Sequence, residues 1–235
     1  MSVHKSRHPM IGKIREFLIA FKSLELLTPQ AMRRPARKGG DIGYGGEQLA
    51  PFLDSLGKAQ KEALVTEFKR FYPQVERVNI STARGGWKKL SIQENFGKLV
   101  KISARHMNDG MLRVLAILAQ AHSNHPVLLF DEIENGINPE LVEKLVDFLV
   151  GMKKQVFVTT HSPMILNYLE DADARESVHL LYRDENGWTR SIRFFDIPET
   201  SQKLEALGPG EVFVDTNLTS LTQRLGLLKS STGKQ

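Results

Sequence analysis

The first half of the chain shows helical spacing of apolar residues, followed by strand-like alternation. Apolar residues at 11, 14, 17, 18, 21 and 24 predict an amphipathic helix over 11–27, which Pro29 would end. Two shorter helices are expected over 47–56 and 59–71, and strands over 75–81, 88–93 and 96–102. The segment 33–46 is rich in Pro, Arg and Gly and is expected to be a loop. Residues 1–107 are therefore predicted to form a helical and α+β portion.

From residue 108 onward, apolar runs alternate with helical patterns. Strands are expected over 127–130, 155–160, 178–182 and 188–194, the last two joined by the hairpin signal at 184–187. Helices are expected over 111–121, 139–149 and 163–169. This alternation favours an α/β lobe with a largely parallel sheet over 108–228. The last residues, 229–235, are mostly small and polar and are predicted to be a disordered tail.

Composition narrows the class of protein. The 235 residues are 41% hydrophobic, enough for a substantial core, yet no run approaches the roughly 20 apolar residues of a membrane helix. The basic N-terminus lacks the uninterrupted apolar stretch of a secretory signal. Cysteine is absent, which excludes disulfides and cysteine-based zinc sites and agrees with a cytoplasmic location.

The net charge of +5 is concentrated early in the chain, and part of it lies in the basic run 33–38. An excess of cations permits nucleic-acid binding, although an ordinary solvated basic surface explains it equally well. No aromatic residue interrupts the run, so the sequence does not indicate a base-stacking platform there.

Two adjacent carboxylates, Asp131 and Glu132, end the apolar run 127–130. In open α/β sheets, ligands bind beyond the carboxyl ends of the strands. Asp131 could hold a phosphate-bound Mg²⁺, an ion that prefers oxygen ligands. Glu132 could orient and deprotonate the water that attacks a γ-phosphate. The alternative is a buried strand that happens to end in surface acids.

Two weaker signals flank the acidic pair. His161 follows the next strand, where an imidazole can contact a γ-phosphate or the attacking water, although a lone histidine is more often structural. Asn108, Asp109 and Gly110 open a helix. One of the first two can cap it, and its free N–H groups can face phosphate oxygens. An ordinary capped helix is the plain alternative.

The order and spacing of these three signals resemble the C-terminal half of ABC-type ATPase heads of the RecF, SMC and OLD-like class. More narrowly, the chain resembles bacterial AAA-family ATP-binding proteins with a similar turn after the acidic pair. The resemblance implies a P-loop NTPase-like, ABC-type head fold. Segments 43–49 and 208–211 also resemble this family, so the likeness covers most of the chain.

The resemblance assigns roles to individual residues. Asp131 and Glu132 match Walker B, with Asp131 at the metal and Glu132 as general base, and His161 matches the switch histidine. Residues 108–113, Arg113 included, match the signature motif, and 134–139, Asn135 included, match the D-loop. The resemblance implies ATP and Mg²⁺ as ligands. Because the signature motif and the D-loop act across a dimer interface in this family, it also implies a homodimer or a partner ATPase lobe.

One part of the family pattern is missing from the sequence. No Gly-Lys pair has the hydroxyl residue and upstream glycine of a Walker A loop. In addition, Asn108 stands where the signature usually has serine.

The chain could be a fragment of a longer ATPase, a subunit completed by another chain, or a degenerate ATPase kept for binding. The competing function is a catalytically incomplete partner that associates with nucleic acid. A Toprim-type nuclease is disfavoured, because too little sequence follows His161. Relatives of this class serve DNA repair and phage defence, and a fold does not choose between such roles.

Overall fold

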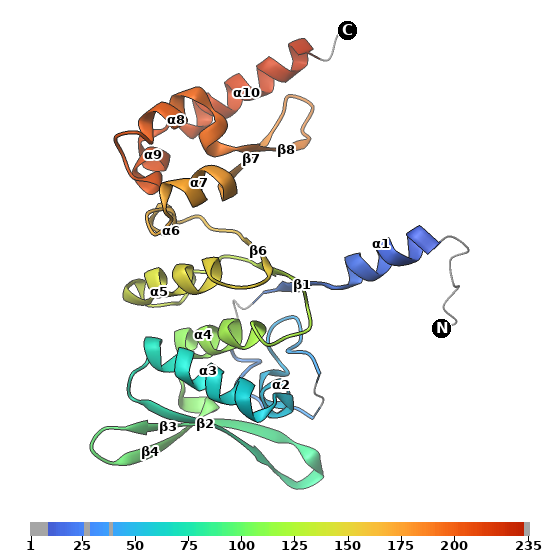
Figure 1. Cartoon of the computed structure of the whole chain (residues 1–235), viewed down its shortest axis with the longest axis vertical. Helices are drawn as coiled ribbons and strands as arrows, with labels where there is room; N and C mark the ends of the chain where they lie inside the picture. The colour runs from blue at the N-terminus through green and yellow to red at the C-terminus, as the bar shows by residue number, and fades with distance from the viewer. Residues whose placement is uncertain (1–8, 26–28, 38–39, 233–235) are drawn as a thin grey trace. The chain divides into compact units, whose positions relative to one another are not determined.

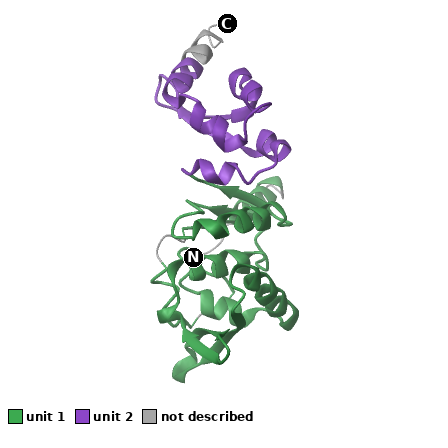
Figure 2. Cartoon of the chain, turned by 90° about the vertical axis from the view of Figure 1, so that its left-hand side faces the viewer, with its two compact units in different colours: residues 1–160 green, residues 161–235 purple. Residues whose placement is uncertain are grey.

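The computed structural model describes residues 9–25, 29–37 and 40–232. The chain divides into two compact units between Thr160 and His161 (Figure 2). The division expected at residue 107 does not coincide with this one. It lies inside the first unit, because the segments on both sides of it pack into the same core.

The first unit contains a parallel and an antiparallel sheet with helices between and around them (Figure 1). Its elements are α1 (Pro9–Ile19), β1 (Phe21–Leu24), α2 (Leu49–Ser55), α3 (Lys58–Phe71), β2 (Val75–Thr82), β3 (Lys88–Asn95), β4 (Leu99–Ser103), α4 (Asp109–Gln120), β5 (Val127–Phe130), α5 (Pro139–Val150) and β6 (Gln155–Val158), with short 3₁₀ turns η1 (Arg84–Gly86) and η2 (Ala104–His106). The parallel sheet has the order β1-β5-β6, and the antiparallel sheet the order β2-β3-β4. The predicted α/β class, with a parallel sheet flanked by helices, is confirmed.

The single helix expected over 11–27 is wrong in its second half. The helix ends at Ile19, and Phe21–Leu24 forms strand β1 instead. This strand pairs in parallel with β5, so that Phe21 lies opposite Val127 and Leu24 opposite Phe130. Pairing with a buried strand outweighs the helical spacing of a short segment, because strand formation depends strongly on tertiary context. Residues 26–28, at the end of the expected helix, lie outside the described residues.

Helix α4 forms the centre of the first unit. Its residues from Gly110 to Gln120 are all buried, and it packs against α3 on one side. Ile117 shares a small cavity with Leu24 and Phe130, so α4 also meets the parallel sheet. An apolar helix that is buried all round is a core helix rather than a surface one. Among the described residues, no helix is long and apolar enough to cross a membrane.

The antiparallel sheet presents one face to the helices and the other to solvent. Leu90 and Ile92 of β3 are buried, and α2 and α3 pack against this sheet. Because side chains alternate along a strand, Lys89 and Gln93 point to the opposite, outer face. The sheet is therefore a two-sided layer with a single apolar face.

The second unit is smaller and mixed in structure. It contains α6 (Pro163–Leu166), α7 (Asp171–Ser177), β7 (His179–Arg183), β8 (Thr189–Arg193), the 3₁₀ turn η3 (Phe194–Asp196), α8 (Pro198–Lys203), α9 (Pro209–Asp215) and α10 (Leu218–Thr232). Strands β7 and β8 form the hairpin that the sequence predicted. The expectation that they belong to the lobe's parallel sheet is wrong, because they pair only with each other in a separate antiparallel sheet. The residues expected to form a disordered tail are helical up to Thr232, and 233–235 lie outside the described residues.

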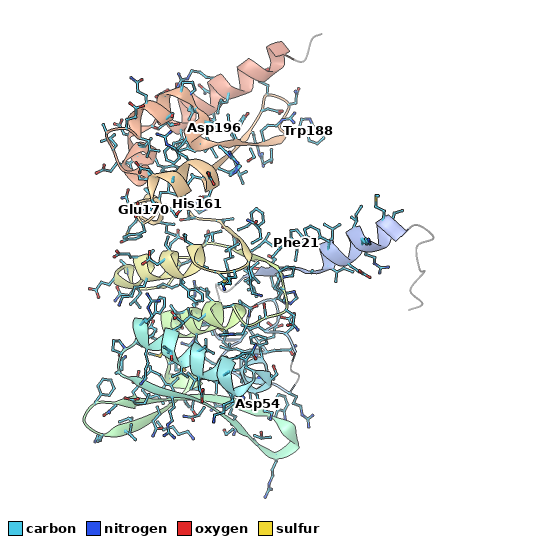
Figure 3. The ribbon with its side chains drawn as sticks, in the orientation of Figure 1. Phe21, Asp54, His161, Glu170, Trp188 and Asp196 are labelled. Carbon is cyan, nitrogen blue, oxygen red and sulfur yellow. The ribbon has the colours of Figure 1, made fainter. Side chains whose placement is uncertain are left out.

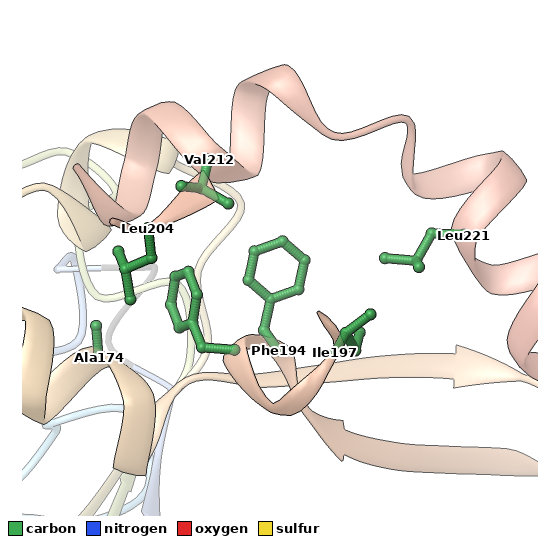
Figure 4. Packing of buried hydrophobic residues seen from close by; sticks show 7 residues of the cluster. Ala174, Phe194, Ile197, Leu204, Val212 and Leu221 are labelled. Atoms are coloured by element: carbon green, nitrogen blue, oxygen red, sulfur yellow. The ribbon is translucent and has the colours of Figure 1, made fainter. Parts of the chain in front are cut away.

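The second unit has its own apolar core. Phe194 and Phe195 lie at its centre with ring centroids 5.0 Å apart (Figure 4). Helices α6 and α9 pack closely, and a side chain at Gly210 would lie 2.3 Å from the carbonyl oxygen of Pro163. Asn167 accepts a 2.9 Å hydrogen bond from the Gly210 N–H. A glycine is therefore required where these two helices meet.

Replacing Leu115 by alanine should destabilise the first unit strongly. This side chain is fully buried in α4, so its loss removes apolar contacts and leaves a cavity that costs about 2–5 kcal/mol. Urea unfolding followed by Trp87 fluorescence in a Trp188→Phe background reports on the first unit alone. The matched control is Leu99→Ala in β4, where the leucine is 59% exposed, and its effect should stay within about 0.5 kcal/mol. Equal effects of the two substitutions would contradict the core described for this unit.

Candidate functional site

The three strands of the parallel sheet end level with one another. Leu24 pairs with Phe130, and Phe130 with Val158. Because the strands run in the same direction, the residues that follow them meet at one edge of the sheet. Asp131 and Thr159 therefore come together, although they are distant in the sequence.

Thr159 links the side chain of Asp131 to the backbone of Glu132. Its hydroxyl donates a short hydrogen bond to Oδ1 of Asp131, and the hydroxyl oxygen accepts a 2.9 Å hydrogen bond from the backbone N–H of Glu132. Its own N–H donates to the carbonyl of Phe130 at 2.9 Å. The Asp131 carboxylate is thereby oriented by a fixed neighbour while it remains exposed.

Glu132 has an unusual backbone conformation. Its φ is +45°, and it is the only residue other than glycine with a positive φ among the described residues. The left-handed region is unfavourable for a residue with a Cβ, at a cost of about 1–2 kcal/mol. Its Oε2 accepts a 3.1 Å hydrogen bond from the side-chain amide of Asn135. The turn therefore holds the Glu132 side chain in one direction against local strain.

The segment after Glu132 is a tight turn that is tied to strand β6. The Glu134 carboxylate accepts a 2.8 Å hydrogen bond from the Thr160 hydroxyl. The N–H of Asn135 donates to the Glu132 carbonyl at 3.0 Å, and Gly136 has a φ of +69°. Glycine is suited to this position because it has no Cβ to clash. The turn ends where Asn138 caps α5, accepting a 3.3 Å bond from the Glu140 N–H.

The start of α4 lies directly against this turn. Asn108 caps the helix by accepting a 2.7 Å hydrogen bond from the Met111 N–H, and Asp109 forms an ion pair with Arg33. At Gly110, an added Cβ would lie 2.7 Å from the carbonyl oxygen of Gly136. The absence of a side chain at Gly110 thus allows the helix start and the turn to touch through their backbones.

Arg113 connects the helix to the acidic pair. It is 6% exposed, and its guanidinium donates a short hydrogen bond to the carbonyl of Asn135. Burial lowers the pKa of this guanidinium, while the charges of Asp109 and Glu132 act in the opposite direction. A buried cation that faces two carboxylates fixes the geometry of the whole turn.

The helix start and the turn border an open groove of about 310 Å³. Its lining residues are Tyr72, Asn108, Asp109, Gly110, Gly136, Asn138 and Leu141. Asn108, Asp109 and Gly110, which the sequence singled out, therefore share one surface with the D-loop-like turn. Asp131, Glu132 and Arg113 border a separate small cavity of about 10 Å³, close to the least volume that holds one water.

Three residues of this region were not singled out from the sequence. Thr159 and Arg33 are engaged as described above. Tyr44, which is exposed, has its pKa raised by a hydrogen bond to Glu25 and by the charges of Glu25 and Asp131. The hydroxyl at the end of β6 was a readable signal for Thr159. Nothing in the sequence indicated that the glycine-rich loop would bring Tyr44 near Asp131.

His161 is the first residue of the second unit, directly after Thr160. It is exposed, and it takes part in at least one interaction. Its proximity to Asp131, which belongs to the first unit, stays a prediction. The other predicted site residues all lie in the first unit.

Comparison with solved structures finds distant likenesses to SMC heads. One is a structure from work on ATP-driven dimerization and DNA-stimulated activation of SMC ATPases, with 15% identity, a TM-score of 0.42, and coverage of 57% of this chain and 84% of that one. A second is the Smc head domain of Pyrococcus yayanosii, with 14% identity, a TM-score of 0.43, and coverage of 57% and 26%. A third is the Smc head of Pyrococcus furiosus bound to the C-terminal domain of ScpA, with 14% identity, a TM-score of 0.44, and coverage of 63% and 38%. The chain thus spans well under half of the two Pyrococcus structures.

A family comparison gives a clear assignment, whereas no curated protein matches the chain. The family described as "AAA domain, putative AbiEii toxin, Type IV TA system" matches residues 28–167, more than half of the sequence. This range contains the start of α4, both carboxylates and the turn that follows them. The chain therefore belongs to this AAA-domain family.

Proposed function

We propose that this chain is the C-terminal half of an ABC-type ATPase head that binds and hydrolyses ATP once a Walker A lobe completes it. The observation that carries the proposal is the pair Asp131 and Glu132 at the end of β5, held by Thr159 and the turn after it. The match to an AAA-domain family supports the same reading.

The donor set at Asp131 fits Mg²⁺ as a half-site. Among the described residues, no group of three or more histidine or acidic side chains could hold a metal by itself. Mg²⁺ commonly binds one or two carboxylates and takes its other ligands from water and substrate phosphates. Asp131 would supply the carboxylate, with Thr159 orienting it. Bound Mg²⁺ would neutralise charge on the β- and γ-phosphates.

Glu132 is proposed to act as the general base. Its carboxylate is held by Asn135 at 3.1 Å, so it can accept a proton from a water placed beside the γ-phosphate. Backbone strain tends to persist at functional sites, where the surrounding structure enforces it. The positive φ of Glu132 supports a role that requires this carboxylate in this direction.

The groove at the start of α4 is proposed to receive a nucleotide held by a second copy or a partner lobe. Asn108 and Gly110 line it together with Gly136 of the turn. The first N–H groups of a helix and its positive dipole end favour phosphate oxygens. Arg113 and Asn135 would act by holding the turn against α4, since the arginine bonds to the Asn135 carbonyl.

An exposed edge of the parallel sheet supports a missing lobe. A Walker A loop follows a strand, and parallel strands are usually covered on both faces. β6, however, is an edge strand of this sheet, and its Phe157 is 52% exposed. The outer side of β1 is occupied instead, since Glu25 N–H donates to the carbonyl of Tyr44 at 3.1 Å and Lys22 pairs with Asp41 at 2.8 Å. We expect the added strand to lie beside β6.

Helix α1 offers a second uncovered apolar surface in the first unit. It leads into β1 at Phe21 (Figure 3). Its apolar side chains Met10, Ile11, Ile14, Phe17, Leu18 and Ile19 are all more than half exposed. Contiguous exposed apolar residues commonly mark an interaction surface. His161 is proposed to sense the γ-phosphate from the end of β6.

Replacing Glu132 by glutamine should abolish ATP hydrolysis in the complete head, meaning this chain together with its Walker A segment. Loss of a general base lowers kcat by about 10²–10⁴-fold, whereas the amide keeps the shape of the side chain. ATP affinity, measured by calorimetry, should remain close to that of the parent protein. The control is Glu140→Gln in the first turn of α5, which should leave kcat unchanged. Equal rates for Glu132→Gln and the parent would remove Glu132 from its proposed role.

The strain at Glu132 can be measured without any nucleotide. Glu132→Gly and Glu132→Ala both remove the carboxylate, so their difference reports the backbone alone. Glycine should be the more stable by about 1 kcal/mol, because it accepts a positive φ. At Glu143, in the middle of α5, the order should reverse, with alanine the more stable by about 1 kcal/mol. Urea unfolding measures all four variants, and alanine proving the more stable at both positions would refute the strain.

A further inference from the structure

The outer face of the antiparallel sheet is a regular grid of polar side chains. In one row across the strands Arg77 lies beside Gln93, which lies beside Lys101. The next row contains Asn79, Ser91 and Ser103, and the third contains Ser81 and Lys89. Neighbouring strands are about 4.8 Å apart, so Arg77 and Lys101 lie within reach of a single extended ligand.

The three rows contain cations and no acids, and the carboxylate of Glu76, whose charge also acts on Arg77, is paired with Lys69. Arg77, Lys89 and Lys101 are exposed, and none of them takes part in an ion pair among the described residues. Two neighbouring cations are instead paired with carboxylates: Lys88 with Asp54 at 2.6 Å, and Lys69 with Glu76 at 2.6 Å. Three cations with only neutral side chains between them in these rows give this face a net positive charge.

An exposed aromatic residue stands at one end of the grid. The alternation that puts Lys89 on the outer face continues to Trp87, which is 42% exposed. The guanidinium of Arg37 lies 5.2 Å from the centroid of this ring, and its Nε donates a 2.6 Å hydrogen bond to the carbonyl of Gly85. The ring is thus held in place by a cation. It also carries a π surface large enough to stack on a nucleobase.

We propose that the outer face of β2-β3-β4 binds single-stranded nucleic acid, with phosphates on Arg77, Lys89 and Lys101 and a base on Trp87. Cationic tracks combined with aromatic platforms are the usual way in which proteins hold single strands without sequence preference. The side-chain amide groups of Asn79 and Gln93, which are partly exposed, can donate to phosphate and sugar oxygens between the cations, whereas Ser91 is buried. A duplex offers no unstacked base to Trp87, so it fits this face less well.

The site differs from the one that the basic run 33–38 indicated. Arg33 is engaged by Asp109 and by the carbonyl of Met107, so it is unavailable to a ligand. Arg37 serves the new site indirectly, as a positioning residue for Trp87. The proposed nucleic-acid site therefore lies on the antiparallel sheet and not on the loop that contains the basic run 33–38. The proposal does not depend on ATP hydrolysis, because none of its residues belongs to the nucleotide site.

Tryptophan fluorescence tests this directly in the full chain. The sequence has two tryptophans, so in a Trp188→Phe background the signal comes from Trp87 alone. Titration with an oligothymidylate about twelve nucleotides long, at low salt, should quench it. The logarithm of affinity should fall with the logarithm of salt concentration with a slope of roughly −2, as expected for three phosphate contacts on a single strand.

Variants separate the two parts of the site. Arg77→Ala with Lys101→Ala should flatten the salt slope by roughly 1.4, and Trp87→Ala, followed by anisotropy of a labelled strand, should weaken binding by about tenfold. The charge-matched control, Lys58→Ala with Lys153→Ala, changes exposed lysines elsewhere in the first unit and should leave binding unchanged. No quenching by the oligothymidylate, tighter binding of a duplex of the same length, or an equal loss in the control would each overturn the proposal.

Discussion

The alignment of three parallel strands is the constraint on which the site depends. β5 is an apolar run that is largely buried, and it is paired with β1 on one side and β6 on the other. Parallel pairing makes the three strands end level. The chain therefore leaves the sheet at one edge with Asp131, Glu132 and Thr159 side by side. The hydrogen bonds that Thr159 makes to both acidic residues follow from this register. A shift of β6 by one residue would turn Thr159 to the other face of the sheet and break both bonds.

Burial of α4 is the second constraint. Because the helix is enclosed along its length, its first turn has no freedom to move away from the turn that follows β5. The contact between Gly110 and Gly136 leaves no room for a side chain at Gly110. Arg113 of the helix also donates a hydrogen bond to the carbonyl of Asn135 in the turn. The groove and the acidic pair are consequently joined through the backbone of one turn.

Charge is used in two different ways in the first unit. Most of its lysines and arginines that lie near carboxylates are paired with them and stabilise contacts between elements, as Lys22 does with Asp41. On the outer face of the antiparallel sheet, by contrast, the cations alternate with neutral residues and face solvent. Exposed ion pairs contribute little to stability, so unpaired cations on this face cost the fold almost nothing. The surface can therefore be kept positive for a ligand.

The sequence by itself determined the element types that carry strong local signals. The apolar run before Asp131, the capped helix after Asn108 and the proline at the start of α5 each predicted their element, because burial, capping and a missing N–H act over a few residues. Asp131, Glu132 and the α4 start could be singled out for the same reason. Tertiary structure alone decided that Phe21–Leu24 is a strand, since its partner β5 is distant in the sequence. It alone brought Arg37 onto Trp87 and Gly110 against Gly136, because no local pattern encodes contacts between residues that far apart in the chain.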